Sequence, residues 1–336
     1  MNRTLKITLA AAAAFLLAWL GRAAYLRAVY PEPMSAEKRR ELLSQPVLHA
    51  ANYRFDPAST LESRIGPPPL FLLNWLRSLD DRPGYTGYTP TPAQRRMIAA
   101  WFDLLPGNMR EVLRERLLGV YLVNDFLGNG LSNLVLGSDG GKYSWAVINT
   151  AGLSKTLSGT LTEREASVFK GGGVSVDCGG AGEPPGAFYT FFHEMTHAYD
   201  YTSGITPYVE REWEELLRGR PPKKRQRWDV WAAYEKPLPE HDHPLRTKLR
   251  FYGMGGGPLL DISEAGALYA WLEKSPFTSL YGTQNWAEDA VERVVHKAIS
   301  DKLGGPCRVV HPGGGFTPGP AAAARSEALY LRLSGK

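Results

Sequence analysis

The segment 193–197 reads His-Glu-Met-Thr-His and carries the strongest chemical signal in the chain. On a helix, residues four apart lie one above the other, so the imidazoles of His193 and His197 can bind one metal ion. Zn²⁺ takes such ligands in tetrahedral geometry, and a catalytic site leaves one position open for water. Glu194 lies about 100° around the helix from His193, where it can meet that water without binding the metal. The pattern predicts metal-assisted hydrolysis with Glu194 as general base.

The residues around this motif are typical of a buried helix. The apolar ones are Ala187, Phe188, Phe191, Phe192 and Met195. Pro184 and Pro185 precede the stretch and Gly204 follows it, where helix boundaries place such residues. A polar pair in so apolar a helix needs a partner, and a metal ion is the simplest one. The alternative is that both histidines are hydrogen-bonded core or surface residues that bind no metal.

A third metal ligand is expected from elsewhere in the chain, and Glu288 is the best candidate. Glu288 and Glu292 lie four residues apart on a predicted helix that Asn285 is placed to cap. The apolar residues on the same side are Val291, Val295 and Ile299. Buried carboxylates are costly unless paired or metal-bound, so we expect Glu288 to bind the metal and Glu292 to bond a ligand histidine. A solvated acidic face is the alternative, and Glu264, which also opens an apolar helix, is the second candidate ligand.

Taken together, the motif H-E-x-x-H-x-x-D at 193–200 and the later Glu288-x-x-x-Glu292 resemble those of the gluzincin metallopeptidases, most closely the lethal-factor-like group. The resemblance implies a single catalytic zinc ion held by His193, His197 and Glu288. It also implies that Tyr281, seven residues before Glu288, stabilises the oxyanion or donates a proton. The resemblance covers residues 120–300, and nearly a hundred residues separate the two motifs, more than in compact members. Its implied substrate is a peptide or protein, paired with a strand at the sheet edge, for which 143–149 is the candidate.

Two further polar features have competing interpretations. Asp200, three residues after His197, either orients a metal ligand or caps a neighbouring element, and a plain surface aspartate is an equal alternative. The sequence Glu-His-Asp-His at 240–243 contains potential metal ligands, but its proline-flanked context favours a solvated loop. Two alternative functions also stay open. One is a zinc amidase that acts on cell wall, and the other is an envelope-anchored binding or assembly protein on a degenerate metallopeptidase scaffold, against which the intact Glu194 argues.

The predicted secondary structure that positions these residues changes along the chain from helices to strands and back to helices. Apolar residues at helical spacing occupy 92–105 and 109–118, and β-branched and aromatic runs follow at 120–126, 132–137 and 143–149. Short turns separate these runs, which predicts a three-stranded antiparallel meander. Helical patterns return at 207–217, 264–272 and 285–303. We therefore expect an α+β fold, a zincin-like domain with a small antiparallel sheet, an active-site helix and a following helix that carries the glutamate ligand.

The chain divides into four predicted parts. Residues 1–30 form an export signal or an N-terminal membrane anchor, because Arg3 and Lys6 precede an apolar run at 7–20. Residues 31–118 form a helical N-terminal region, residues 119–310 the zincin-like catalytic region with an insertion at 210–258, and residues 311–336 a Gly/Pro linker and a C-terminal helix. The protein is thus expected outside the cytoplasm, in the periplasm or cell envelope, where Cys178 and Cys307 either form one disulfide or stay apart.

Composition limits the other classes of function. The chain has 336 residues, of which 43% are hydrophobic and 22% charged, as in a globular protein. Much of its net charge of +5 comes from a basic run at 218–227, which a solvated loop explains better than a contact with an anionic surface. No nucleic-acid-binding signature accompanies this run, so we expect no nucleic-acid partner. Membrane association is expected only through the N-terminal segment.

Overall fold

The computed structural model describes residues 32–180, 182–223 and 226–336. The predicted export or anchor segment at 1–30 lies outside the described residues, as do Lys224 and Arg225 of the basic run. In the part of the chain that is described, no helix has the length and apolar character needed to cross a membrane.

The central sheet contains three long strands, β3 (Leu117–Asn124), β4 (Gly130–Leu136) and β5 (Lys142–Asn149). Strand β5 lies between the other two, parallel to β3 and antiparallel to β4, so the predicted antiparallel meander is wrong. Strands β3 and β5 are buried over most of their length, and such doubly covered strands occupy the centre of a sheet. The edge strand is therefore β4 and not 143–149. An isolated bridge between His49 and Leu136 covers its far end.

The N-terminal region is mostly helical but also contributes to the sheet. Its helices are α2 (Ala36–Ser44), α3 (Leu70–Leu79), α4 (Pro92–Phe102) and α5 (Gly107–Arg116). The short strands β1 (Ile65–Gly66) and β2 (Thr86–Gly87) both pair with β3. Trp101 and Phe102 of this region pack edge-on against Phe191 of the motif helix. Helices α4 and α5 thus share a core with α8, whereas the buried residues of α3 belong to a second cluster with Tyr121 and Trp145 of the sheet.

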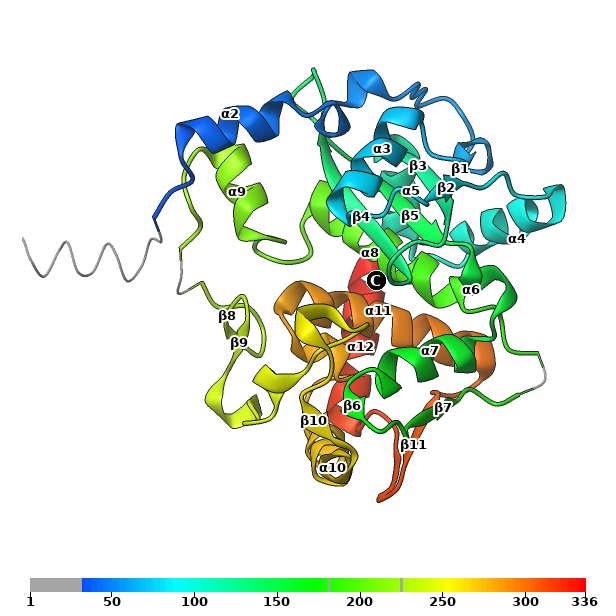
Figure 1. Cartoon of the computed structure of the whole chain (residues 1–336), viewed down its shortest axis with the longest axis vertical. Coiled ribbons are helices and arrows are strands. Elements are labelled where there is room, and N and C mark those ends of the chain that lie inside the picture. Colours follow the sequence, from blue (N-terminus) through cyan, green and yellow to red (C-terminus); the bar gives the residue numbers. More distant parts are fainter. Residues whose placement is uncertain (1–31, 181, 224–225) are drawn as a thin grey trace, which may run out of the picture.

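Two long helices form the other half of the molecule (Figure 1). Helix α8 (Ala187–Ser203) packs against β4 and β5, and α11 (Trp286–Leu303) packs against α8. Helix α12 (Pro320–Leu333) covers α11. Because β12 (Gly314–Phe316) pairs with β11 (Arg308–His311), the predicted Gly/Pro linker is instead part of a hairpin, and the C-terminal tail belongs to the core.

Shorter elements connect these layers. The remaining helices are α6 (Ala151–Ser154), α7 (Leu157–Ala166), α9 (Arg211–Arg218) and α10 (Ala265–Lys274). The remaining strands are β6 (Phe169–Lys170), β7 (Ser175–Asp177), β8 (Trp231–Ala233), β9 (Lys236–Pro237) and β10 (Leu260–Asp261). Single 3₁₀ turns are η1 (Pro46–Leu48), η2 (Ala50–Asn52), η3 (Glu62–Arg64), η4 (Pro239–His241), η5 (Arg246–Lys248), η6 (Met254–Gly256), η7 (Ile262–Glu264) and η8 (Tyr281–Thr283).

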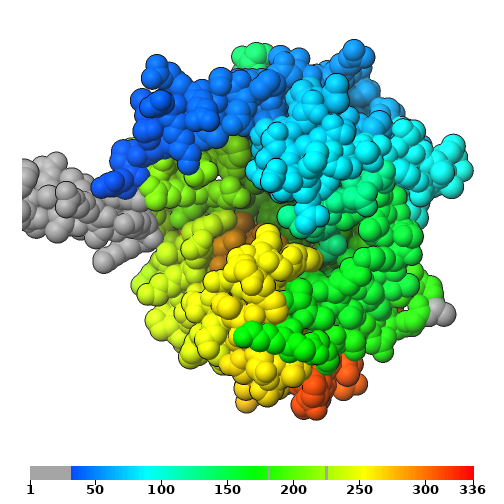
Figure 2. Space-filling view, viewed as in Figure 1, coloured from blue at the N-terminus to red at the C-terminus, as the bar shows by residue number. Residues whose placement is uncertain are grey.

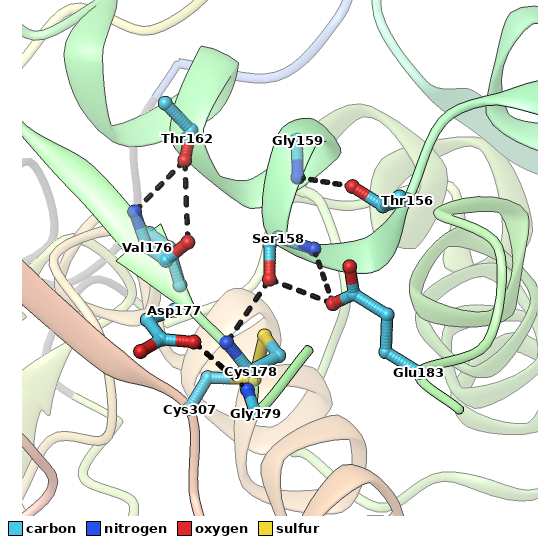
Figure 3. Close-up of a disulfide and its surroundings, with 10 residues drawn as sticks. All are labelled: Thr156, Ser158, Gly159, Thr162, Val176, Asp177, Cys178, Gly179, Glu183 and Cys307. Carbon is cyan, nitrogen blue, oxygen red and sulfur yellow. Dashed lines mark hydrogen bonds between the residues drawn. A yellow bond between two sulfur atoms is a disulfide. The ribbon is translucent and has the colours of Figure 1, made fainter. Parts of the chain in front are cut away.

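A disulfide joins Cys178, just after β7, to Cys307, just before β11 (Figure 3). The two cysteines are 129 residues apart in the sequence, and both α8 and α11 lie between them. The hydroxyl of Ser158 accepts the backbone N–H of Cys178 at 3.0 Å and donates to the carboxylate of Glu183 at 2.6 Å. The bridge therefore fixes the strand that precedes α8 to the strand that follows α11.

Candidate metal centre

Helix α8 holds its two histidines at the boundary between the sheet and α11. Apolar residues of α8 fill the core on the side that faces the sheet, and Gly204 ends the helix with a positive φ of 77°. His193 and Glu194 keep only 7% and 5% of their surface exposed. The motif is thus built into the interior of the fold, where an unpaired polar group would be costly.

Three potential ligand atoms converge between α8 and α11. The Oε2 atom of Glu288 lies 3.3 Å from Nε2 of His193 and 3.5 Å from Nε2 of His197. All three atoms lie within 4.8 Å of one another. Zinc bonds of about 2.0–2.1 Å in a tetrahedron place neighbouring ligand atoms about 3.3 Å apart. Both separations from Glu288 are close to that edge, so the three side chains are placed to hold one zinc ion.

The chemistry of the donor atoms also suits a cation. Oε2 of Glu288 is buried and has no hydrogen-bond partner among the described residues. Burial lowers the pKa of His193, but the carboxylates of Glu288 and Glu292 raise it by more, to about 10. Burial likewise raises the pKa of Glu288, and the two histidines lower it to about 2. The pocket thus attracts positive charge, which a divalent metal ion supplies together with the missing partner of Glu288.

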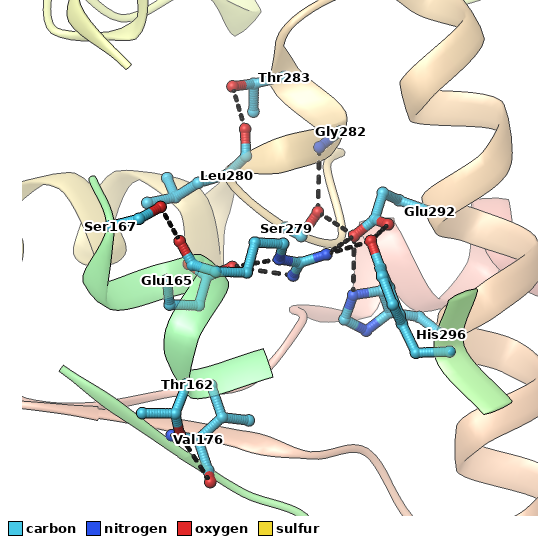
Figure 4. Close-up of polar contacts among 12 residues, drawn as sticks. Thr162, Glu165, Ser167, Val176, Ser279, Leu280, Gly282, Thr283, Glu292 and His296 are labelled. Atoms are coloured by element: carbon cyan, nitrogen blue, oxygen red, sulfur yellow. Dashed lines mark hydrogen bonds and ion pairs between the residues drawn. The ribbon is translucent and has the colours of Figure 1, made fainter. Parts of the chain in front are cut away.

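Glu292, one turn after Glu288 on α11, is fully buried and contacts several residues around this centre. Its Oε1 lies 3.3 Å from Nδ1 of His193 and accepts the hydroxyl of Tyr189 at 2.6 Å. Its Oε2 accepts the hydroxyl of Ser279 at 2.6 Å (Figure 4) and the guanidinium of Arg164 at 2.8 Å. Burial alone would raise the pKa of Glu292, but Arg164 holds it well below its ordinary value. Glu292 is therefore an ionised acceptor that fixes the ring of His193.

Arg164 is the functional residue that sequence reasoning missed. It lies on α7, keeps 2% of its surface exposed and also donates to the hydroxyl of Tyr189 at 2.6 Å. Its other partner is Glu165, which in turn accepts the hydroxyl of Tyr269 at 2.6 Å. Nothing in the polar sequence of α7 indicates that this arginine is buried, because its partner is distant in the chain.

Glu194 lies on the other side of His193, against the edge strand β4. A Cβ atom at Gly130 would lie 2.8 Å from Oε1 of Glu194 and 2.6 Å from Cγ2 of Thr190, so only glycine fits there. Burial raises the pKa of Glu194, which makes this carboxylate a better proton acceptor. Glu194 also lines a cavity of about 250 Å³ that His193 and Tyr281 share.

Tyr281 lies on η8, half-buried, at the wall of this cavity. Its ring meets the ring of His193 edge-on, with 5.7 Å between centroids, and packs against Phe251 at 4.8 Å. Burial raises the pKa of Tyr281 well above its ordinary value, so the phenol stays protonated and can donate a hydrogen bond. The backbone N–H of Gly282 donates to Ser279, whose hydroxyl ties this turn to Glu292 (Figure 4).

The other predicted polar residues lie outside the centre. Asp200 accepts the backbone N–H groups of Ile205 and Thr206 at 2.6 and 2.9 Å, so it caps the turn after α8. Nδ1 of His197 has no hydrogen-bond partner in the described part of the chain, and Asp200 therefore does not orient this ligand. Glu264 accepts the backbone N–H of Asp261 at 2.9 Å and caps its own helix, so it is not the alternative ligand. The 240–243 segment forms a separate turn at η4.

The insertion supplies the wall of the cavity that faces the N-terminal region. Tyr252, with a positive φ of 56°, accepts a hydrogen bond at its hydroxyl from Nδ2 of Asn129 at 3.0 Å. Tyr252 and Met254 both line the cavity. Figure 2 shows the yellow segment of the insertion and the cyan N-terminal segment on opposite sides of a hollow in this face. Access to the centre is thus bounded by two parts of the chain that lie outside the two motifs.

Comparison with family models, curated proteins and solved structures finds no match for this chain.

Proposed function

We propose that this protein is a zinc-dependent hydrolase, and specifically a metallopeptidase with a zincin-like catalytic domain. The observation that carries the proposal is the convergence of His193, His197 and Glu288 at separations that suit tetrahedral zinc. The position of Glu194 beside a cavity adds to it, because a structural zinc site needs neither a neighbouring base nor space for a substrate.

The residues around the site have distinct roles in the proposed reaction. When bound, zinc polarises the scissile carbonyl and makes water more acidic. Glu194 accepts the proton of the attacking water and passes it to the leaving amine. Tyr281 donates a hydrogen bond to the oxygen on which negative charge develops. Strand β4, as the edge of the sheet, pairs with an extended substrate through backbone groups on its side away from β5.

The proposal is tested by measuring zinc content and peptide hydrolysis of the full chain and three variants. We expect about one zinc ion in the wild type and in Glu194→Gln, with hydrolysis lost by a factor of about 10²–10⁴ in the latter. Glu288→Ala should lose both the metal and the activity. Glu264→Ala is the matched control, because this glutamate opens a helix and caps its own turn, and should keep both.

Two results would overturn the proposal in different ways. Zinc retained in Glu288→Ala would show that Glu288 is not a ligand and would rule out the proposed three-ligand site. A wild type that binds zinc but hydrolyses no peptide would favour the binding or assembly protein instead.

We also propose that the protein functions outside the cytoplasm. The basic and apolar pattern of residues 1–20 supports export, and the disulfide between Cys178 and Cys307 is of a kind that persists in oxidising compartments. Cell fractionation combined with thiol alkylation tests this. The folded protein should appear in the envelope fraction with both cysteines protected, and alkylation of both in a cytoplasmic fraction would contradict it.

A further inference from the structure

The cavity beside Glu194 has mostly apolar walls. The apolar residues that line it are Leu79, Phe126, Leu127, Leu131 and Met254, with the rings of Tyr189, Tyr252 and Tyr281. Its volume of about 250 Å³ is below the roughly 300–1,000 Å³ typical of sites for drug-sized molecules. A cavity of this size and lining suits a single large side chain next to the reacting bond.

Two apolar side chains remain exposed at the mouth of this cavity. Leu79, at the end of α3, has 54% of its surface exposed, and Met254, in the insertion, has 50%. Both line the cavity, one from the N-terminal region and one from the insertion. Exposed apolar groups that line one cavity gain free energy when a ligand covers both of them.

The charge of the cavity disfavours an acidic substrate side chain. No lysine or arginine is among the residues that line it. Its two carboxylates are Glu194, assigned above to proton transfer, and Asp80, which accepts the hydroxyl of Tyr85 at 2.7 Å. An acidic substrate side chain would meet these carboxylates without a cation to balance its charge. A lysine side chain would be attracted by these carboxylates but would have to leave water for apolar walls, so the Lys pool is the decisive competitor in the test.

A hydrogen bond and the central sheet hold the walls of this cavity in place beside Glu194. The hydrogen bond from Asn129 to Tyr252 joins the start of β4 to the insertion across the cavity. Leu131 and Gly130, which also line the cavity, belong to β4 itself. A peptide paired with β4 would therefore run directly past these apolar walls.

We infer that the substrates are peptides with a large apolar side chain, such as leucine or phenylalanine, next to the scissile bond. Leu79 and Met254 are the residues that determine this specificity. The inference rests on the proposed peptidase function, but the recognition itself needs only the cavity and not the chemical step.

The experiment uses the full chain loaded with zinc and peptide pools in which one position is fixed as Leu, Phe, Ala, Asp or Lys. Cleavage is followed with the wild type, and binding is followed by fluorescence anisotropy with Glu194→Gln. Leu79→Asp and Met254→Asp test the two walls in both backgrounds. Leu70→Asp and Leu259→Asp are matched controls, because these leucines are 68% and 47% exposed on neighbouring segments and do not line the cavity.

We expect kcat/KM and binding to favour the Leu and Phe pools over the Asp and Lys pools by about tenfold or more. Leu79→Asp and Met254→Asp should remove most of this preference, and the two controls should keep it. If nothing is cleaved but the binding preference follows the variants, the peptidase function fails while apolar recognition stands. The inference is overturned if the pools bind equally, or if the preference survives in both cavity variants.

Discussion

Nδ1 of His193 and Oε1 of Glu292 lie 3.3 Å apart, and this contact joins α8 to α11 next to the three proposed ligand atoms. The carboxylate receives further hydrogen bonds from Tyr189 and Arg164, so its orientation is fixed independently of the histidine. A metal ligand held in this way keeps one tautomer and one ring orientation, which increases its affinity for the ion. We therefore expect the zinc affinity of the proposed centre to depend also on residues that are not among its three ligands.

Replacement of Glu292 by glutamine should weaken zinc binding by about 10–100-fold, because the amide is a poorer acceptor for His193 and leaves Arg164 with Glu165 as its remaining counter-charge. Competition with a chelator of known affinity measures this directly. Glu165→Gln is the control, since Glu165 bonds Arg164 and Tyr269 but no histidine. Equal loss of zinc affinity in both variants would show that general destabilisation, and not the contact with His193, is responsible.

The Tyr281→Phe variant should bind zinc normally and show a lower kcat with little change in KM. Removing the hydroxyl deletes a hydrogen bond that forms only as charge develops on the substrate oxygen, and a loss of about 10²-fold is typical for such a donor. Steady-state kinetics and metal analysis on the same preparation check both points. A KM that rises while kcat stays constant would assign Tyr281 to substrate binding instead.

Gly130→Ala should reduce activity strongly while zinc stays bound. The added Cβ would lie 2.6 Å from Cγ2 of Thr190 and 2.8 Å from both Oε1 of Glu194 and the backbone oxygen of Val147, so the carboxylate of Glu194 and the pairing of β4 with β5 must both adjust. Pairing the change with Thr190→Ser removes one of the three close contacts and should restore part of the activity. Gly66→Ala, in β1, is the control because nothing lies within 4 Å of its added Cβ. Full activity of Gly130→Ala would mean that Glu194 is not held against β4.

Replacement of Arg325 by methionine should destabilise the fold by about 3 kcal/mol, because α12 loses its ion pairs with the buried Asp289 and with Asp229. Burial raises the pKa of Asp229, but Arg325 and Arg293 lower it by more, so its folded pKa lies below the unfolded value. This part of the stability is complete above about pH 4 and is lost as the pH falls through the folded pKa.

Urea denaturation at several pH values tests this ion-pair effect. The difference in unfolding free energy between wild type and Arg325→Met should therefore shrink below about pH 4. Arg332→Met, an exposed position on the same helix, should change little at any pH. A difference that stays constant with pH would assign the effect to packing of α12.

The convergence of His193, His197 and Glu288 was predictable from the sequence because the residues of each motif occur at helical spacing. His193 and His197 lie on one face of α8, and the four-residue step from Glu288 to Glu292 places both carboxylates toward them. The cap by Asn285 was also predictable, since its side chain accepts the N–H of Glu288 at 2.9 Å. Local periodicity and capping rules act over one or two turns, which is the range of these contacts.

Relations between distant segments were not predictable in the same way. The order of β3, β5 and β4 depends on which strand is covered on both faces, and adjacent runs with short turns resemble a meander in either case. Arg164 donates a hydrogen bond to Glu292, which is 128 residues away in the sequence, and no pattern of residue spacing predicts such a contact. Asp200 was ambiguous because an acceptor one turn after a ligand can serve the ligand or the helix end. In the structure, Asp200 accepts hydrogen bonds from the backbone N–H groups of Ile205 and Thr206.

The disulfide makes the segment from Cys178 to Cys307 a covalent ring that contains His193, His197 and Glu288. A single cut of the backbone between α8 and α11 would open this ring into two chains that stay linked, with two ligands on one chain and the third on the other. Arg218, whose side chain is 53% exposed, lies between the two helices and has the residue type after which trypsin-like enzymes cut. Proteolytic nicking would thus yield a two-chain protein with all three ligands still attached, and only subsequent reduction would release the half that carries Glu288.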